Sequence, residues 1–361
     1  MLYHLLFGLR NIFSPLNIFQ YITFRAFGAI FTSFILTIIL TNLMVAYMKR
    51  RMITQPIRDD GPATHHAKQG TPTMGGIAIL VSMAVTTALW ARLDNRFILW
   101  LLGGVIFLGM LGFADDYLKH VKKNSRGLSA SKKLAGQIVL AVSVALYLRQ
   151  YPAAAAFADT INIPYLKDAY IGLGALYAAF VVFVILGASN GVNFTDGLDG
   201  LAIGNLVVAA FTFSIFAYLA GNVRFAQYLK IIYVPGAGEI TVYLAAMLGT
   251  GLGFLWYNTH PAQIFMGDTG SLFLGGGLGM VAVFIKQELL LVIIGGVFVA
   301  EVLSVILQVQ YFKRTGKRIF RMAPLHHHYE LGGLSEPKIT VRFIIISIVL
   351  SLVALASLKL R

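Results

Sequence analysis

Charged residues and cysteines are scarce in this sequence. Only 12% of its 361 residues are charged and none is a cysteine, whereas 58% are hydrophobic. The lack of cysteine excludes disulfide bonds and thiol catalysis. A composition this apolar also excludes a soluble globular protein of this length. We therefore expect an all-α polytopic membrane protein. It should form one integral membrane domain over residues 1–361, because mostly short polar loops separate the apolar runs.

Several common motifs are missing as well. There is no Walker A sequence, no dinucleotide-binding glycine fingerprint after a strand and no HExxH, so ATP-driven work and zinc hydrolysis have no local support. Residues 1–20 contain apolar side chains but no small-residue cleavage site after a charged start, and we interpret them as an N-terminal interfacial segment. The net charge of +14 suits anionic lipid and phosphorylated substrates. Nucleic acid is not expected as a partner, because no basic tract stands apart from the membrane loops.

The apolar runs predict about ten transmembrane helices. Several runs are shorter than the ~20 residues that a span needs, so their ends should extend into the flanking loops. An even number of spans places both termini on the same side of the membrane. The expected spans are residues 26–47, 73–90, 97–113, 134–148, 171–186, 201–219, 240–255, 272–285, 289–309 and 343–358.

The distribution of basic residues predicts the orientation of these spans. The loops after the first, third and ninth spans carry eighteen of the 29 lysines and arginines. We expect these loops, including the long loop at residues 310–338, to be cytoplasmic and both termini to be periplasmic. Seven of the eight histidines and most loop aspartates fall on the same side. This segregation predicts an active site at the cytoplasmic face.

Asp115 and Asp116 end the third span and precede a basic stretch. Two adjacent carboxylates at the C-terminal end of a helix repel each other and face the negative end of the helix dipole. Nearby groups must therefore compensate their charge. Two interpretations are open: a solvated helix end neutralised by Lys119, Lys122 and Lys123, or a site for a divalent cation and phosphates.

A second acidic stretch, residues 190–200, follows the fifth span. Asp196 and Asp199 are three residues apart and share a face if the stretch is helical, while Asn193 or Thr195 could cap the sixth span. A capped helix start is one interpretation. The other is a loop that accepts hydrogen bonds from a base or sugar, or holds a cation.

Asp268 lies just before the eighth span, where it could be a helix N-cap or a ligand of Mg²⁺. Phe265, three residues earlier, could offer an aromatic face to a base. In the loop after the first span, Lys68 and Thr73 are candidate phosphate or nucleotide contacts. Glu301 falls near the middle of the ninth span and should face the bundle interior, but its role stays open.

Three consecutive histidines, His326, His327 and His328, lie in a basic stretch. Consecutive helical residues point in different directions, so the three are not expected to bind one metal ion. One or two could donate to a pyrophosphate while the others pack. Carboxylates for Mg²⁺, surrounding lysines and histidines, and a membrane boundary together favour phosphoryl transfer from a soluble anionic donor to a lipid acceptor.

Four motifs together resemble the bacterial phospho-N-acetylmuramoyl-pentapeptide-transferases, the MraY translocases of the polyprenyl-phosphate N-acetylhexosamine-phosphate transferase superfamily. They are residues 113–117, 193–202, 258–268 and 322–330, and the resemblance extends from about residue 21 to the C-terminus. The stretch Met-Ala-Pro-x-His-His-His distinguishes this family from the wider superfamily.

The resemblance implies transfer of phospho-MurNAc-pentapeptide from UDP-MurNAc-pentapeptide to undecaprenyl phosphate in the bacterial cytoplasmic (inner) membrane. The products would be lipid I and UMP, the cofactor Mg²⁺ and the assembly a homodimer. A transferase that uses UDP-GlcNAc on the same lipid carrier is the alternative within the enzyme class. A transporter of lipid-linked substrate is the alternative from another class.

The resemblance also implies roles for individual residues. Asp115, Asp116 and Asp268 would be catalytic, with Asp115 the preferred base and Asp268 the Mg²⁺ ligand. Lys119 and Lys133 would face phosphate, although Ser131 replaces a common arginine of the motif and leaves Lys132 open as an alternative to Lys133. The remaining substrate-binding residues would be Lys68, Thr73, Asn193, Asp196, Gly197, Leu198, Asp199, Asn258, Phe265, Gln308, His326, His327 and His328.

Overall fold

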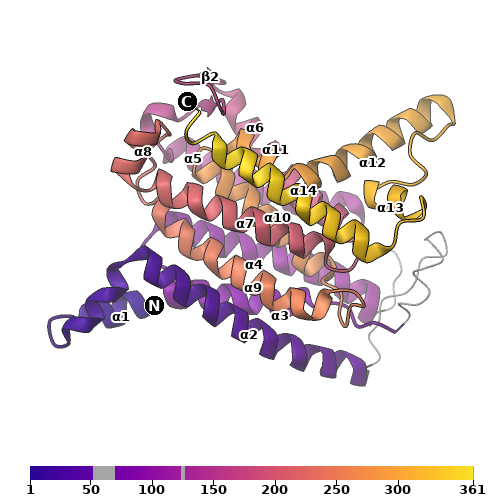
Figure 1. The fold of residues 1–361 in the computed structure, drawn as a ribbon, viewed down its shortest axis with the longest axis horizontal. Helices are drawn as coiled ribbons and strands as arrows, with labels where there is room; N and C mark the ends of the chain where they lie inside the picture. Colours follow the sequence, from indigo (N-terminus) through magenta and orange to yellow (C-terminus); the bar gives the residue numbers. More distant parts are fainter. Residues whose placement is uncertain (52–69, 123–126, 361) are drawn as a thin grey trace.

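A computed structural model describes residues 1–51, 70–122 and 127–360, and its fold is a bundle of long helices (Figure 1). Lys68 lies outside the described residues. In chain order the α-helices are α1 Leu2–Gly8, α2 Ile22–Arg51, α3 Gly76–Trp90, α4 Arg96–Asp116, α5 Ala130–Gln150, α6 Leu176–Thr195, α7 Leu201–Ala220, α8 Val223–Leu229, α9 Ile240–Asn258, α10 Gly267–Phe284, α11 Glu288–Ile294, α12 Gly296–Thr315, α13 Leu325–Glu330 and α14 Glu336–Ala356.

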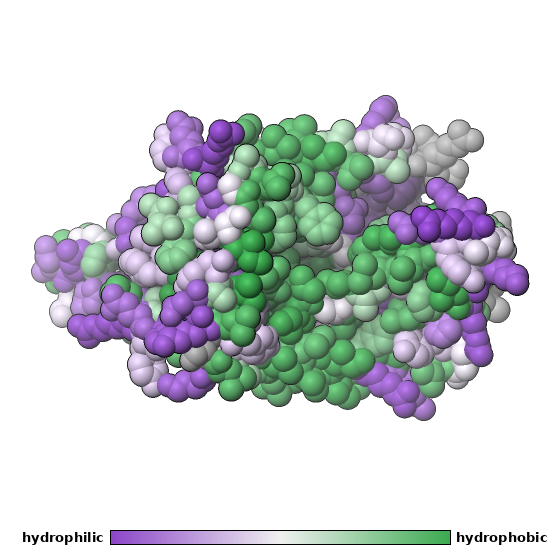
Figure 2. All heavy atoms as spheres, turned by 90° about the horizontal axis from the view of Figure 1, so that it is seen from above, coloured by the Kyte–Doolittle hydropathy of each residue, from purple (hydrophilic) through white to green (hydrophobic). Residues whose placement is uncertain are grey.

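The helices fit a membrane-spanning bundle. Within the described ranges, nine are long and apolar enough to cross a membrane, and α3 is a further apolar helix of 15 residues. Figure 2 shows hydrophobic side chains gathered across the middle of the molecule and hydrophilic ones at its two ends. The expectation of an all-α polytopic membrane protein is therefore confirmed in its architecture.

Three details differ from the sequence prediction. The ninth apolar run is broken at Gly295 into α11 and α12. Helix α6 continues to Thr195, so the predicted cap of the next span by Asn193 or Thr195 is wrong: both residues lie inside α6, and α7 starts after Gly200 without a side-chain cap. Asp196 and Asp199 consequently lie in the turn between these helices and do not share a helical face.

A small hairpin covers one end of the bundle. Strand β1, Thr160–Asn162, pairs antiparallel with β2, Tyr170–Gly172. In Figure 1 this hairpin and both chain termini lie toward one end of the molecule, and α13 lies toward the opposite end.

Helix α10 is the central helix of the bundle. It packs against α4 on one side and α6 on another, and 89% of its apolar window is buried inside the molecule. The first turn of α10 therefore meets the last turns of α4 and α6. These turns carry the aspartates that the sequence singles out.

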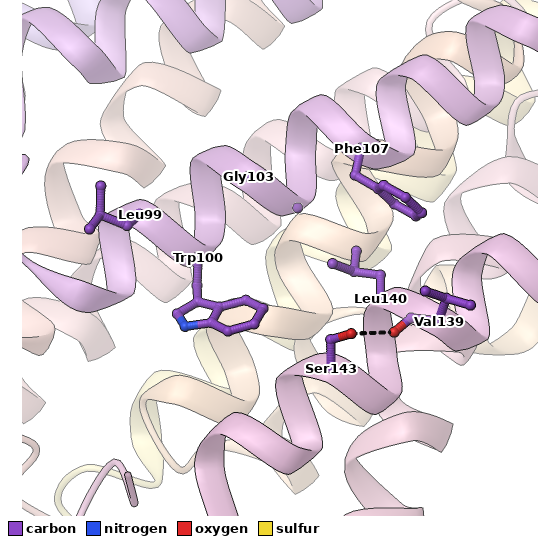
Figure 3. Close-up of a pocket in the computed structure, with 8 residues that line it drawn as sticks. Leu99, Trp100, Gly103, Phe107, Val139, Leu140 and Ser143 are labelled. Carbon is purple, nitrogen blue, oxygen red and sulfur yellow. Dashed lines mark hydrogen bonds between the residues drawn. The ribbon is translucent and has the colours of Figure 1, made fainter. Parts of the chain in front are cut away.

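An apolar hollow of about 390 Å³ lies between α4 and α5 (Figure 3). Trp100, Phe107 and Leu140 are among its lining side chains. The hydroxyl of Ser143 donates to the carbonyl of Val139 at 2.8 Å, so this lining hydroxyl is satisfied within α5. The lining thus suits a hydrocarbon chain and contains none of the carboxylates at the far end of α4.

Candidate active site

Three carboxylates from two helices meet at one end of the bundle. Asp115 and Asp116 end α4, Asp268 belongs to the first turn of α10, and each can place one oxygen within 4.8 Å of the others. Asp115 and Asp116 are buried, whereas the Asp268 side chain keeps 18% of its surface exposed. Asp268 is therefore the member of the group that is open to a ligand.

Asp116 caps the first turn of α10 from the neighbouring helix. Its carboxylate accepts the backbone N–H groups of Asp268 at 3.1 Å and Thr269 at 2.8 Å, and the Thr269 hydroxyl at 2.6 Å. The first N–H groups of a helix have no partner inside the helix, so this contact satisfies them. The interpretation of Asp268 as the N-cap is thus replaced: Asp116 does the capping and leaves the side chain of Asp268 free for other contacts.

Two lysines lie between Asp115 and Asp268. Lys133 places Nζ 2.7 Å from Asp268 Oδ2 and 3.3 Å from Asp115 Oδ2. Lys119 forms an ion pair with Asp115 and lies 3.4 Å from Asp268 Oδ2. Of the three lysines predicted to neutralise the aspartate pair, Lys119 does so, Lys122 lies exposed and Lys123 lies outside the described residues. Lys133, which the sequence does not predict for this role, supplies the second compensating charge.

The backbone N–H of Leu128 and the side-chain amide of Asn193 also contact this cluster. The N–H of Leu128 donates to Asp115 Oδ1 at 2.7 Å. The amide of Asn193, in the last turn of α6, donates to Asp268 Oδ1 at 3.1 Å and to the Ser271 hydroxyl at 2.8 Å. Four helices, α4, α5, α6 and α10, thus hold Asp115 and Asp268 in place.

Asp196 caps the C-terminal end of α6 and faces the same cluster. Burial, together with the negative charges of Asp268 and Asp116, raises the pKa of its carboxyl to about 7, although a backbone hydrogen bond from Gly267 acts in the opposite direction. A carboxyl that titrates near neutral pH is typical of functional sites.

The oxygen-rich donor set fits a hard divalent cation. Mg²⁺ prefers carboxylate oxygens and usually takes only one or two of them, keeping water or phosphate in its other positions. Asp268 offers the exposed carboxylate, and Asp115 and Asp116 supply further negative charge within 4.8 Å. The acidic cluster is therefore chemically suited to Mg²⁺.

Asp199 points away from these carboxylates into a second polar cluster. Its Oδ2 lies 3.1 Å from His260 Nδ1 and accepts the Ala262 N–H at 3.0 Å. Glu336, the first residue of α14, accepts the Asp199 N–H at 2.6 Å. Asn258 accepts the Gly200 N–H at 3.1 Å. These contacts join three loops that are far apart in the sequence.

The three histidines have different surroundings. His326 is buried beside Glu301, and its Nδ1 lies 3.2 Å from Glu301 Oε1. His327 Nδ1 lies 3.0 Å from Glu330 Oε2. His328 accepts the Arg321 N–H on Nδ1 at 3.1 Å, so a neutral His328 ring carries its proton on Nε2. His326 is thus a packed member of the triplet, and the ring of His328 presents a donor.

Other predicted site residues are held by the protein itself. Gln308 accepts the N–H groups of Ile319 at 3.0 Å and Phe320 at 2.9 Å, and Leu198 is buried in a small apolar cluster at the start of α14. Thr73 is buried next to Pro72, whose carbonyl accepts the Phe265 N–H at 2.9 Å. Gly197 lies against the ring of His326.

Some residues of these clusters could not be selected from the sequence. Thr269, Ser271 and Glu336 are common residue types outside the motifs, and their partners lie 78 or more residues away in the chain. His260 did carry a signal, because it lies within the motif at residues 258–268.

Comparison with known proteins agrees with this arrangement. The profile of glycosyl transferase family 4 matches residues 98–286, and signature 1 of the phospho-N-acetylmuramoyl-pentapeptide-transferases matches residues 68–80. The phospho-N-acetylmuramoyl-pentapeptide-transferase of Endomicrobium trichonymphae is 58% identical over 361 residues. Those of Geobacter sp. (strain M21) and Desulfotalea psychrophila are each 53% identical. All three alignments cover 100% of both chains. The chain therefore belongs to glycosyl transferase family 4 and, within it, to the phospho-N-acetylmuramoyl-pentapeptide-transferases.

Proposed function

We propose that this protein transfers phospho-MurNAc-pentapeptide from UDP-MurNAc-pentapeptide to undecaprenyl phosphate, giving lipid I and UMP for peptidoglycan synthesis. The observation that carries the proposal is the cluster of Asp115 and Asp268 bridged by Lys119 and Lys133 at one end of a membrane bundle. Ammonium groups at such a boundary can bind the phosphates of a soluble donor and of a lipid acceptor together. Membership of the family supplies the identity of both substrates.

Mg²⁺ is the proposed cofactor, with Asp268 as its protein ligand. When bound, Mg²⁺ neutralises charge on the donor pyrophosphate. The chain's own residues prepare the position: Asn193 orients Asp268 through Oδ1, and Lys119 and Lys133 approach Oδ2.

Asp115 is the proposed base. Asp116 has its oxygens engaged by the first turn of α10, whereas Asp115 Oδ2 meets the ammonium groups of Lys119 and Lys133. Once these lysines turn to phosphate, Asp115 Oδ2 can accept the proton of the lipid phosphate. The freed phosphate oxygen forms a bond to the β-phosphorus of the donor, the bond from that phosphorus to the bridging oxygen breaks, and UMP leaves.

A direct transfer of this kind is favoured over a two-step route through a phosphorylated carboxylate. Asp268 is the exposed candidate nucleophile, but a carboxylate that binds Mg²⁺ and two lysines is a weak nucleophile. A phosphorylated enzyme trapped with donor in the absence of lipid acceptor would contradict the direct route.

The site is proposed to lie at the cytoplasmic face of the bacterial inner membrane. Lys119, Lys133 and the basic residues in the last turns of α2 and α12 lie at the end of the bundle that holds the acidic cluster, as the positive-inside rule requires of a cytoplasmic surface. Both termini would then be periplasmic. A homodimer is proposed from family membership alone.

The first test is UMP release by the purified protein in detergent with Mg²⁺ and undecaprenyl phosphate. We expect release with UDP-MurNAc-pentapeptide and not with UDP-GlcNAc, and we expect Asp115→Asn and Asp268→Asn each to lower the rate by about 100-fold or more. Release only from UDP-GlcNAc would overturn the donor. Movement of labelled lipid across vesicles without UMP release would instead indicate a transporter.

A further inference from the structure

Glu301 is a fully buried carboxylate that the proposed chemistry does not use. It lies in the second turn of α12, within a candidate membrane span, and has 0% of its surface exposed. An isolated charge at this position is costly, so it must have a partner. The contacts that Glu301 makes with α13 identify this partner.

The carboxylate of Glu301 receives the first turn of α13. The His326 N–H donates to Oε1 at 3.2 Å and lies 3.4 Å from Oε2. Residue 324, at the N-cap of α13, provides no side-chain hydrogen bond, so Glu301 supplies the acceptor that the short helix lacks. The contact joins α12 and α13 across 25 residues of chain.

The same carboxylate also acts on the imidazole ring of His326. Nδ1 lies 3.2 Å from Oε1, which favours a proton on Nδ1 because a lone pair there would face a negative oxygen. Among the described residues neither ring nitrogen of His326 has a partner in hydrogen-bond geometry, so the approach of Nδ1 to Oε1 is an electrostatic contact. Nε2 faces Gly197: a Cβ built on Gly197 would lie 2.2 Å from Nε2, so the ring rests directly on the backbone of this loop.

A continuous path of contacts therefore leads from α12 to both parts of the site. The ring of His326 meets Gly197, next to Asp196, and its centroid lies 4.2 Å from that of His327. We propose that Glu301 is a positioning residue: it holds His326 so that α13 and the loop at Asp196–Asp199 are fixed relative to each other for binding of the UDP-linked donor. This inference rests on the proposed function.

The test measures UMP release by the full-length protein in detergent with Mg²⁺, varying UDP-MurNAc-pentapeptide and undecaprenyl phosphate separately. Glu301→Gln keeps the size of the side chain but removes its charge. We expect the KM for the donor to rise about tenfold, the factor for loss of one charge-assisted hydrogen bond, while the KM for the acceptor stays the same. Ser304→Ala is the matched control, because Ser304 is buried one turn further along α12 and bonds only to the Glu301 backbone carbonyl.

A double-mutant cycle separates positioning from general loss of fold. If Glu301 acts through His326, the variant that combines Glu301→Gln with His326→Asn should raise the donor KM no more than the stronger single change. The proposal would be overturned if the effects of the two changes add up, or if the donor KM of Glu301→Gln is unchanged. It would also be overturned if the KM values for donor and acceptor both change in proportion to the loss of folded protein.

Hydrogen exchange gives a readout that needs no turnover. The His326 amide should exchange faster in Glu301→Gln than in Ser304→Ala, because only the former weakens its acceptor. Equal exchange in the two variants would overturn the inference even if the enzyme is active. If the wild-type protein releases no UMP but exchange still differs between the two variants, the proposed function is refuted and the contact between Glu301 and His326 stands.

Discussion

Asp115 and Asp116 are adjacent in the sequence, yet the structure gives them different surroundings. Consecutive positions on a helix point about 100° apart, so one side chain can reach the lysines while the other reaches α10. The sequence predicts that the pair needs compensation. It does not predict which carboxylate caps α10, because the partners of Asp116 lie 152 and 153 residues away.

Replacing Asp116 should therefore lower stability more than replacing Asp115. Asparagine at 116 keeps one acceptor oxygen and would turn its amide toward the N–H of either Asp268 or Thr269, and a buried donor left without an acceptor costs about 1–3 kcal/mol. Asparagine at 115 can still accept the Leu128 N–H. Thermal unfolding of both variants in detergent checks this, and equal shifts in melting temperature would contradict it.

The raised pKa of Asp196 predicts a pH dependence of stability. The folded protein keeps a proton on this carboxyl up to pH about 7, whereas the unfolded chain releases it near the ordinary value of 3.8. The stabilisation is thus complete below the ordinary pKa and is lost as the pH rises to about 7.

Asp196→Asn should remove this dependence. In EDTA-containing buffer, the melting temperature of the variant relative to wild type should increase between pH about 5 and pH about 8. A difference that stays constant across this range would show that Asp196 has an ordinary pKa. Asp168→Asn, in the exposed loop between β1 and β2, is a control that should show no such trend.

At the scale of elements, apolar runs predict where most helices lie but not where they break. The run that contains α11 and α12 reads as one span, because Gly295 and Gly296 in an apolar sequence equally suit close helix packing. Likewise Asn190 and Gly191 resemble a loop, but α6 continues through them because tertiary packing overrides local propensity.

The start of α10 depends on Gly267. This residue has a φ of +74°, and a Cβ there would lie 2.7 Å from Asp116 Oδ2. Gly316 has a similar φ of +69° with nothing within 4 Å of its Cβ position. Alanine should strain the backbone at both positions, but only at Gly267 would its Cβ also press on the carboxylate of Asp116, which caps α10.

Gly267→Ala should accordingly be more harmful than Gly316→Ala. We expect the control to lose about 1 kcal/mol from the strained φ alone. The variant at 267 should lose more stability and most of its UMP release, because Asp116 must move away from α10. Unfolding and activity measured side by side check this, and matching losses at both positions would refute the role of the close contact.

At the scale of the whole molecule, a buried ion pair lies at the end of the bundle opposite to the acidic cluster. Away from the acidic cluster, Arg25 of α2 makes two hydrogen bonds of 2.6 Å to Glu239, next to the start of α9. Both side chains are buried. Removing one partner of a buried pair leaves an uncompensated charge, which costs about 3–5 kcal/mol.

Glu239→Gln should therefore lower the melting temperature strongly while the folded fraction keeps its normal rate of UMP release. Asp94→Asn is the matched control, because its ion pair with Arg92 is half exposed and should contribute less than about 1 kcal/mol. A fall in the rate per folded molecule would show that the two ends of the bundle are coupled.

The cap that Asp116 makes on α10 also has a consequence for biosynthesis. The contact between Asp116 and Thr269 spans 153 residues, so the ribosome completes the aspartate pair long before the helix that it caps. During that interval α4 and its two carboxylates enter the membrane without α10. Lys119, one helical turn away, and Lys133, in the next helix, are the compensating groups already synthesised nearby. The same lysines that are proposed to meet phosphate in the finished enzyme would thus shield the nascent hairpin of α4 and α5 while the rest of the chain is still being made.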